Sequence, residues 1–205
     1  MSSHTRAVLV IATRNPGKLR ELQRILDDLP FELRTLRDYP DLPVLPEEGA
    51  MYAENAVSKA VTVARWTGEI ALADDSGIEV DYLEGRPGVH SARFLGDDAT
   101  DEDRNREVLR RLEGVPPESR TARYRAVVAV AFPDGSVRTF EGVCEGMIAR
   151  TPRGEGGFGY DPIFYVPELD RTVAELSPEE KDRISHRGQA LRAARGFLAE
   201  LARGS

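Results

Sequence analysis

The sequence predicts an α/β fold in which helices flank a mixed β-sheet. The β-branched apolar run Ala7–Ala12 indicates a buried strand, and leucines and isoleucines at helical spacing over residues 19–29 indicate a helix directly after it. Further along, Arg123–Phe132 and Ser136–Ile148 are rich in strand-forming residues, and the Pro133-Asp134-Gly135 turn that joins them is typical of an antiparallel hairpin. A strand followed by a helix, together with a long hairpin, favours a mixed sheet.

The composition indicates a soluble, cytoplasmic protein with a single domain over residues 1–205. The hydrophobic fraction of 40% and the charged fraction of 31% are ordinary for a globular chain of this length. The net charge of −7 argues against a nucleic-acid partner, because binding DNA or RNA requires a basic face. The single cysteine, Cys144, excludes internal disulfides and suits a reducing compartment. We expect no membrane partner, since no apolar run approaches the roughly 20 residues of a membrane span.

Periodicity and capping residues predict the elements in the first half of the chain. Residues 31–36 indicate a second strand, and a helix is expected over residues 51–66. Its buried stripe is expected to consist of Ala53, Ala56, Val57, Ala60, Val61 and Ala64. Thr100 with Asp103 resembles a capping box that opens a strongly charged surface helix.

The stretch Ile70–Ala73 predicts a buried strand, and Asp74, Asp75, Ser76 and Gly77 follow it directly. Two neighbouring aspartates at the end of a strand repel each other unless a cation or a proton lies between them. One interpretation is therefore a divalent metal site with one carboxylate free to act on water. The alternative is a solvated Asp-Asp-Ser-Gly turn.

The segment between the first strand and the first helix has the composition of an anion-binding loop. Asn15 can cap the helix, Pro16 suits its first position, and Lys18 falls in its first turn. The N–H groups and the positive dipole end of the helix attract an anion, to which Lys18 adds its charge. The alternative is an ordinary βα turn with a surface lysine.

Lysine is rare in this chain, which makes its positions informative. Only three of the 28 basic residues are lysine, namely Lys18, Lys59 and Lys181. A compact ammonium binds a phosphate as a point charge where a planar guanidinium does not fit. Lys59 lies outside the predicted apolar stripe of its helix, so a solvated helix position is the alternative for it.

The last quarter of the chain combines a glycine-rich loop with two helix starts. Residues 153–162 contain four glycines and the aromatic residues Phe158 and Tyr160, which suits close approach to a ligand and stacking on a base. Ser177 with Glu180 forms a capping box. The segment Ser185-His186-Arg187-Gly188 then precedes a final amphipathic helix, where two solvated polar residues are the alternative to a carbonyl-binding pair.

Taken together, these segments resemble the inosine triphosphate pyrophosphatase family, the house-cleaning dITP/XTP diphosphatases. The resemblance covers nearly the whole chain and rests on the ordered set rather than on a single motif. The motifs are Thr13-Arg14-Asn15-Pro16-Gly17-Lys18, Glu54-Asn55-Ala56 with Lys59, Ala73-Asp74-Asp75-Ser76-Gly77, Pro87-Gly88 with Ser91-Ala92-Arg93, Gly156-Gly157-Phe158-Gly159-Tyr160-Asp161-Pro162, Glu180-Lys181 and Ser185-His186-Arg187-Gly188.

The resemblance implies an elongated α/β fold with a central mixed sheet and two lobes around a nucleotide cleft. It implies a homodimer that hydrolyses non-standard purine nucleoside triphosphates (ITP, dITP and XTP) to the monophosphate and pyrophosphate. Mg²⁺ is the implied cofactor. Such an activity cleanses the nucleotide pool and keeps these bases out of DNA and RNA.

The same resemblance assigns roles to individual residues. Asp75 is the proton acceptor and a metal ligand, and Ser76 contacts the substrate. The phosphates are assigned to Thr13, Arg14, Asn15, Pro16, Gly17 and Lys18, with Lys59 and Lys181 nearby. The base is assigned to Phe158, Gly159, Tyr160, Asp161, His186 and Arg187. Donors that face a 6-oxo group reject adenine, because its 6-amino group leaves them unpaired.

One stretch departs from the pattern of this family. The family usually has Glu-Thr-Gly before the Glu-Asn helix, whereas this chain has Glu47-Glu48-Gly49. Aligning the chain on Gly49 and Lys59 places the second metal carboxylate at Glu47, and Glu48 is close enough to take that role.

Two other interpretations compete with this one. The first is a Maf-type pyrophosphatase that acts on modified or pyrimidine nucleotides, which the glycine-aromatic loop and the Ser-His-Arg segment fit less well. The second is a non-catalytic nucleotide-binding sensor, against which the presence of Asp75, Lys18 and Lys59 weighs.

Overall fold

The computed structural model describes residues 6–47 and 49–204. Its strands are β1 (Val8–Ile11), β2 (Glu32–Thr35), β3 (Ile70–Val80), β4 (Thr121–Ala131), β5 (Val137–Ile148), β6 (Phe164–Val166) and β7 (Arg171–Thr172). Its helices are α1 (Pro16–Leu26), α2 (Tyr52–Thr67), α3 (Asp101–Arg111), α4 (Pro178–Ile184) and α5 (His186–Gly204). None of these helices, within the residues described, has the length and apolar composition needed to cross a membrane.

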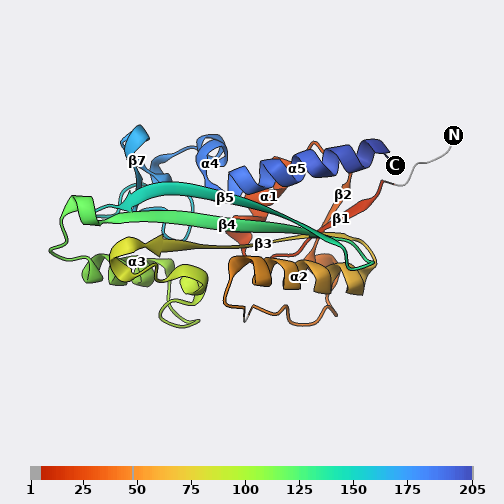
Figure 1. Ribbon diagram of the computed structural model, residues 1–205, viewed down its shortest axis with the longest axis horizontal. Helices are drawn as coiled ribbons and strands as arrows, with labels where there is room; N and C mark the ends of the chain where they lie inside the picture. The colour runs from red at the N-terminus through yellow and green to blue at the C-terminus, as the bar shows by residue number, and fades with distance from the viewer. Residues whose placement is uncertain (1–5, 48, 205) are drawn as a thin grey trace. The chain divides into compact units, whose positions relative to one another are not determined.

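The strands form one mixed sheet, as the sequence predicts. Their order is β2-β1-β3-β4-β5-β6-β7 (Figure 1). Strand β1 pairs in parallel with β2 and β3, whereas β6 runs antiparallel to β5 and β7. The predicted hairpin between β4 and β5 is confirmed: the Phe132 N–H donates to the Ser136 carbonyl at 2.9 Å, and Gly135 adopts the positive φ of 91° that favours glycine.

The predicted helix starts are confirmed by their capping bonds. Asn15 caps α1 by accepting a hydrogen bond from the Lys18 N–H at 3.0 Å. The Thr100 hydroxyl accepts from the Asp103 N–H at 3.1 Å at the start of α3. The capping box of Ser177 and Glu180 opens α4 in the same way. In each case an otherwise unpaired N–H of the first helical turn gains a partner.

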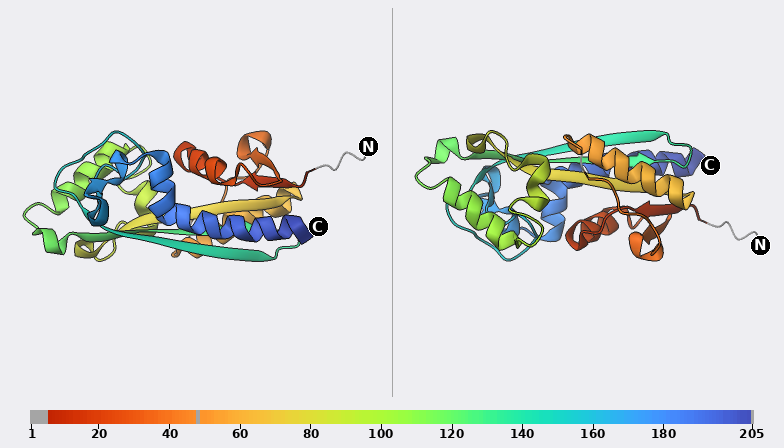
Figure 2. Two further views of the ribbon diagram at one scale, coloured as in Figure 1. Left: turned by 90° about the horizontal axis from the view of Figure 1, so that it is seen from above. Right: turned by 90° about the horizontal axis from the view of Figure 1, so that it is seen from below.

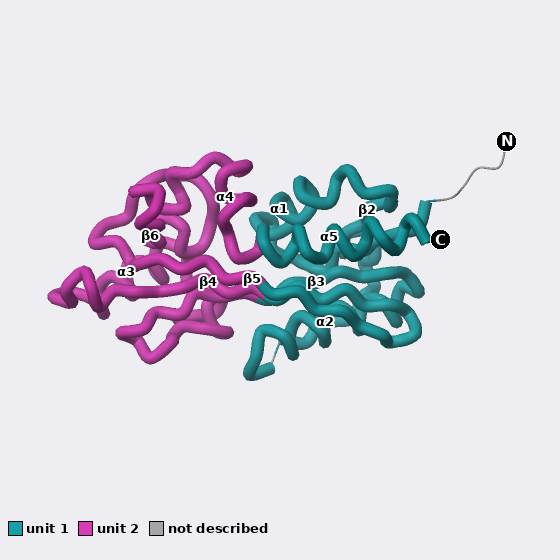
Figure 3. The backbone as a smooth tube through the Cα atoms, turned by 45° about the horizontal axis from the view of Figure 1, so that its top comes forward, with its two compact units in different colours: residues 1–75, 127–141, 188–205 teal, residues 76–126, 142–187 magenta. Residues whose placement is uncertain are grey.

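The chain divides into two compact units, which Figure 3 shows in different colours. Unit 1 comprises residues 1–75, 127–141 and 188–205, and unit 2 comprises residues 76–126 and 142–187. Strands β3, β4 and β5 each contribute residues to both units. The expectations of a single domain and of a nucleotide cleft between two lobes stay predictions.

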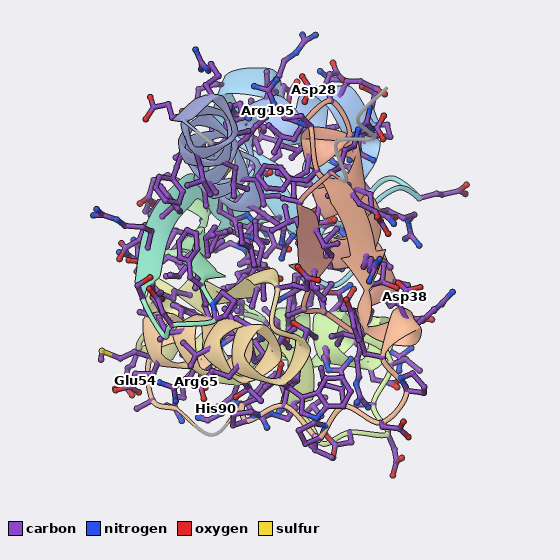
Figure 4. All side chains as sticks on the ribbon, turned by 90° about the vertical axis from the view of Figure 1, so that its right-hand side faces the viewer. Asp28, Asp38, Glu54, Arg65, His90 and Arg195 are labelled. Carbon is purple, nitrogen blue, oxygen red and sulfur yellow. The ribbon has the colours of Figure 1, made fainter. Side chains whose placement is uncertain are left out.

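Helices cover both faces of the strands in unit 1. Helices α1 and α5 lie on one face and α2 lies on the other, as the views from above and below show (Figure 2). The face toward α1 and α5 is apolar and fully buried at its centre. The core there includes Leu9, Ile11, Leu22, Leu26, Leu72, Val128, Val130, Leu191 and Leu198. On the outer surface, Arg195 of α5 donates from Nε to Asp28 Oδ1 at 3.0 Å, just beyond the end of α1 (Figure 4).

Unit 2 has a separate core built from the other halves of the long strands. Val108 and Leu112 of the α3 segment pack with Ile78 of β3 and with Phe164 of β6. The prediction that α3 is a surface helix is correct for its charged side, while Arg104, Asn105 and Val108 are buried on the other side. This core supports the loop 153–162, whose conformation is irregular as expected.

One sequence-based expectation about regular structure was wrong, and another was correct only in part. Strand β3 does not stop at Ala73 but runs through the two aspartates to Val80, so the solvated turn is excluded. The buried stripe of α2 was predicted correctly in half of its members, since Ala56, Ala60 and Ala64 are buried, whereas Ala53, Val57 and Val61 are only partly buried. Apolar periodicity missed part of the buried face because two of its side chains, Asn55 and Lys59, are polar.

We predict that Leu22→Ala lowers the free energy of unfolding by about 2–5 kcal/mol, because Leu22 is fully buried and the substitution leaves a cavity. Urea titration followed by circular dichroism measures the change. The control is Val44→Ala, whose side chain is 85% exposed and which should leave the midpoint unchanged. Equal midpoints for the Leu22 variant and the wild-type protein would contradict the core described here.

Candidate functional site

The loop after β1 is organised around the start of α1. The Thr13 hydroxyl accepts a hydrogen bond from the Asn15 N–H at 3.2 Å, and Asn15 in turn caps the helix. Lys18, in the first helical turn, lies with its Nζ 3.0 Å from Asp74 Oδ2. Arg14 is exposed. The strand, polar loop and helix start predicted for an anion site are therefore present, and the lysine is paired with a buried carboxylate rather than solvated.

The two adjacent aspartates point to opposite faces of β3. Successive side chains of a strand alternate between faces, so Asp74 falls on the side of Leu72 and Asp75 on the side of Ala73. Their partners agree with this alternation, because Asp74 pairs with Lys18 of α1 and Asp75 bonds to Asn55 of α2. The expectation that a cation or a proton lies between the two aspartates assumed that they share a face, whereas in the structure each carboxylate has its own partner on its own side of the strand.

Asp75 occupies a buried position beside one neutral donor and two lysines. Its Oδ2 accepts a hydrogen bond from Asn55 Nδ2 at 3.0 Å, and its Oδ1 lies 3.8 Å from Lys59 Nζ. Burial raises the pKa of Asp75 above its ordinary value, while the charges of Lys18 and Lys59 and the Asn55 bond lower it in part. The Asp74 charge is the smallest of these influences on the pKa of Asp75. A carboxylate with a raised pKa is a better proton acceptor.

Lys59 joins Asp75 to a second carboxylate. Its Nζ lies 2.9 Å from Glu47 Oε1, and the lysine is only 4% exposed. The alternative interpretation of Lys59 as a solvated helix residue was therefore wrong. Glu47 and Asp75 both face one positive charge, which makes this place in unit 1 a candidate cation site with hard oxygen donors. Glu48, the other residue considered for this role, lies outside the described residues.

In unit 2, Asp161 is the centre of a buried hydrogen-bond network. Its Oδ2 lies 2.6 Å from Lys181 Nζ and accepts from the Phe158 N–H at 2.9 Å. Its Oδ1 accepts from the Tyr124 hydroxyl at 3.2 Å. Asp161 is 3% exposed, so these donors compensate a charge that has left water. Its carboxylate holds Lys181 and the loop backbone in place.

The ring of Phe158 faces two cations. Lys181 Nζ lies 4.5 Å and the Arg187 guanidinium 5.5 Å from the centre of this ring. Arg187 also donates to the Ser76 hydroxyl at 2.7 Å. His186 stacks on Tyr124 with ring centres 4.5 Å apart and planes 9° from parallel.

The first two residues of α5 are buried. His186 and Arg187 are 4% and 3% exposed, so the alternative of two solvated helix-start residues was wrong. Tyr160 is buried as well, and its hydroxyl donates to the Ser91 carbonyl at 2.8 Å. The Asn105 side chain donates to the Gly159 carbonyl at 3.1 Å. The glycine-aromatic loop is thus held by side chains from three other segments.

The structure brings the expected residues together in two groups. In unit 1 these are Thr13–Lys18, Glu47, Lys59 and Asp75, and in unit 2 they are Ser76, Phe158–Asp161, Lys181, His186 and Arg187. Sequence reasoning missed Tyr124, whose partners lie 37 and 62 positions away and which belongs to no motif. It also assigned no role to Asn55, although this residue belongs to the Glu54-Asn55-Ala56 motif on which the family resemblance partly rests.

The structure is thus an α/β protein with paired carboxylates and lysines in unit 1 and, in unit 2, an aromatic ring that faces two cations. A family model for the Ham1 family matches residues 9–197. This chain therefore belongs to the Ham1 family, which confirms the resemblance inferred from the motifs.

Individual relatives and a solved structure agree with this assignment. The dITP/XTP pyrophosphatase of Desulforamulus reducens is 51% identical over 193 residues, which are 94% of this chain and 96% of that protein. The dITP/XTP pyrophosphatase of Thermus thermophilus is 55% identical over 185 residues, covering 90% of this chain and 88% of the other. The structure of a HAM1 protein from Coxiella burnetii matches with a TM-score of 0.86 at 44% identity, over 95% of this chain and 99% of that one.

We predict that Asp75→Asn stabilises the metal-free protein at neutral pH. The folded-state pKa of Asp75 is raised, so its contribution to stability is favourable below the ordinary value of 3.8 and is lost as the pH rises through the folded-state pKa. The variant should therefore melt at a higher temperature than wild type at pH 7 in EDTA, and this difference should shrink toward pH 3.8.

The control has the opposite sign. Hydrogen bonds from Arg123 and Thr121 lower the pKa of Asp81, so its contribution is present at neutral pH and is lost as the pH falls. Asp81→Asn should accordingly lower the melting temperature at pH 7. A fall in melting temperature for Asp75→Asn as well would show that the environment of Asp75 stabilises its charge.

Proposed function

We propose that this protein is a dITP/XTP pyrophosphatase, which hydrolyses ITP, dITP and XTP to the nucleoside monophosphate and pyrophosphate. The observation that carries the proposal is the setting of Asp75, a buried carboxylate with a raised pKa that faces Lys59 and is held by Asn55. Membership of the Ham1 family and the names of the relatives support the same activity. Its role would be to keep these bases out of DNA and RNA.

The phosphate end of the substrate would bind to residues of unit 1. The helix start at Asn15–Lys18 offers N–H groups and a positive dipole end, and Lys18 and Lys59 offer compact charges. Thr13 and Arg14 belong to the same loop. Asp75 would accept a proton from the water that hydrolyses the anhydride linkage between the α- and β-phosphates. Lys18 and Lys59 would balance the charge that develops on the departing pyrophosphate.

Mg²⁺ fits the carboxylates of this site. Glu47 Oε1 and Asp75 Oδ1 lie 2.9 and 3.8 Å from one ammonium nitrogen, so two hard oxygen donors already face a single positive charge. Mg²⁺ prefers one or two carboxylates together with substrate oxygens and water. Glu47 and Asp75 would hold the ion, which when bound polarises the phosphate oxygens.

The base would bind to residues of unit 2. Phe158 provides an aromatic face, Gly159 and Tyr160 shape the loop, and Lys181 and Arg187 offer N–H donors. Asp161 would act by holding Lys181 and the Phe158 backbone. Ser76 and His186 complete the set, with Ser76 bonded to Arg187. Donors presented to the 6-oxo group accept ITP, dITP and XTP and disfavour a 6-amino base.

The protein is also proposed to act in the cytoplasm and as a homodimer, without a nucleic-acid or membrane partner. The family resemblance supports the homodimer. The net charge of −7 disfavours a nucleic-acid partner, and the single cysteine suits a reducing compartment.

We predict that the purified protein releases pyrophosphate from dITP and XTP in the presence of Mg²⁺, with little release from dATP, because the 6-amino group of adenine leaves the donors unpaired. Ion chromatography separates pyrophosphate from orthophosphate and measures both. Orthophosphate as the only product would mean that a different bond is hydrolysed. Equal rates with dITP and dATP would contradict the proposed base recognition.

We predict that Asp75→Asn lowers kcat for dITP by about 10²–10⁴-fold, because the general base is removed. Binding of dITP, measured by calorimetry, should be retained. The control is Asp38→Asn, an exposed carboxylate of the same unit labelled in Figure 4, which should keep the wild-type kcat. A kcat within a few-fold of wild type for Asp75→Asn would exclude Asp75 as the base.

A further inference from the structure

The side chain of Asn55 joins two separate segments of unit 1. It lies on α2 and is 3% exposed. Its Oδ1 accepts a hydrogen bond from the Gly49 N–H at 2.7 Å, while its Nδ2 faces the Gly49 carbonyl at 3.4 Å and donates to Asp75 Oδ2 at 3.0 Å. A backbone N–H only donates and an ionised carboxylate only accepts, so these partners fix the orientation of the amide. One buried amide therefore ties the backbone two residues after Glu47 to the carboxylate of Asp75.

Gly49 is the residue that allows this approach. A Cβ at position 49 would lie 2.7 Å from Asn55 Oδ1 and 2.9 Å from the Cβ of Glu54, closer than side chains tolerate. Gly49 is absent from the residues with positive φ, so contact with Asn55 rather than a left-handed backbone requires glycine there. We call this pair of contacting residues, Gly49 and Asn55, the Asn55 clamp.

Lys59 lies one helical turn after Asn55 and on the same face of α2. Its Nζ faces Glu47 Oε1 at 2.9 Å and Asp75 Oδ1 at 3.8 Å. Helix α2 therefore links the segment containing Glu47 to Asp75 twice, once through a neutral amide and once through a cation. Because Asn55 binds Oδ2 of Asp75, Oδ1 is the oxygen that points toward Lys59 and toward the side of Glu47.

We propose that Asn55 is a positioning residue that sets the spacing and orientation of Glu47 and Asp75 for a divalent cation. The inference rests on the metal site of the proposed function and adds to it the group that arranges the two ligands. A small cation such as Mg²⁺ demands near-ideal geometry from its oxygen ligands. Groups that orient such ligands typically contribute about 10–100-fold to metal affinity or activity.

Binding of Mn²⁺ alone to the full-length protein tests the clamp without relying on catalysis. Electron paramagnetic resonance of free Mn²⁺ gives the dissociation constant for wild type, Asn55→Leu and Gly49→Ala. Leucine keeps the size of asparagine and removes its hydrogen bonds, and alanine displaces the Asn55 amide. Each substitution should weaken Mn²⁺ binding about 10–100-fold. The double variant should bind Mn²⁺ as tightly as whichever single variant binds it less tightly, because both substitutions break the same contact between Gly49 and Asn55.

The matched control is Glu54→Gln. Glu54 is next to Asn55 and accepts hydrogen bonds from the Ala50 and Met51 N–H groups, so it supports the same segment without contacting Asp75. This variant should bind Mn²⁺ with wild-type affinity. A loss as large as that of Asn55→Leu would show that general support of the segment, and not the tie to Asp75, governs metal binding, and would overturn the proposal.

The remaining outcomes separate this inference from the proposed function. Wild-type protein that releases pyrophosphate from dITP and binds Mn²⁺, while both clamp variants bind Mn²⁺ equally well, overturns the positioning role alone. If the losses of Mn²⁺ affinity from the two substitutions multiply in the double variant, Gly49 and Asn55 act independently, which overturns the clamp. Wild-type protein that binds no Mn²⁺, or that needs no divalent cation, overturns the metal site and the clamp together. Failure to release pyrophosphate from dITP or XTP, together with Mn²⁺ binding that both clamp substitutions weaken, overturns the proposed function and leaves the positioning role of Asn55 in place.

Discussion

The alternation of side chains along β3 is the constraint on which the charged centre of unit 1 depends. Two consecutive aspartates are tolerated in a buried strand because the pleat directs them to opposite faces. Strand β1 pairs with β3 only up to the level of Leu72, so both aspartates lie beyond the point where this neighbour has ended. Lys18, in the helix that follows β1, is therefore able to pair with Asp74 and also to lower the pKa of Asp75.

The buried carboxylates Asp161 of unit 2 and Asp75 of unit 1 differ in how well their surroundings stabilise a negative charge. Asp161 receives hydrogen bonds from Tyr124, from the Phe158 N–H and from Lys181, so its charge is fully supported and its role is to hold other groups. Asp75 has one neutral donor and a lysine at 3.8 Å, and its pKa is raised. A buried carboxylate that its surroundings only partly stabilise is suited to accept a proton, and the stability lost in this way is typical of active sites.

Much of the fold could be predicted from local signals. Capping residues at Asn15, Thr100 and Ser177 and the turn at Gly135 act over a few positions, so they mark helix starts and the hairpin reliably. The inward face of α2 could be derived this way only in part: Ala56, Ala60 and Ala64 are buried as expected, but apolar periodicity assigns Lys59 to solvent. Its burial depends on Glu47 and Asp75, which are 12 and 16 positions away and whose placement only the folded chain determines.

The central claim is that burial raises the pKa of Asp75 and that Lys18 and Lys59 each affect this pKa more strongly than the neighbouring Asp74 does. Carbon-13 NMR titration of the Asp75 carboxyl in the metal-free protein tests it directly, with Lys18→Gln, Lys59→Gln and Asp74→Asn for comparison. The account predicts that both lysine substitutions raise the pKa of Asp75 further and that Asp74→Asn lowers it by a smaller amount. A larger change from Asp74→Asn than from either lysine substitution would mean that the two carboxylates share one site, and would contradict the account.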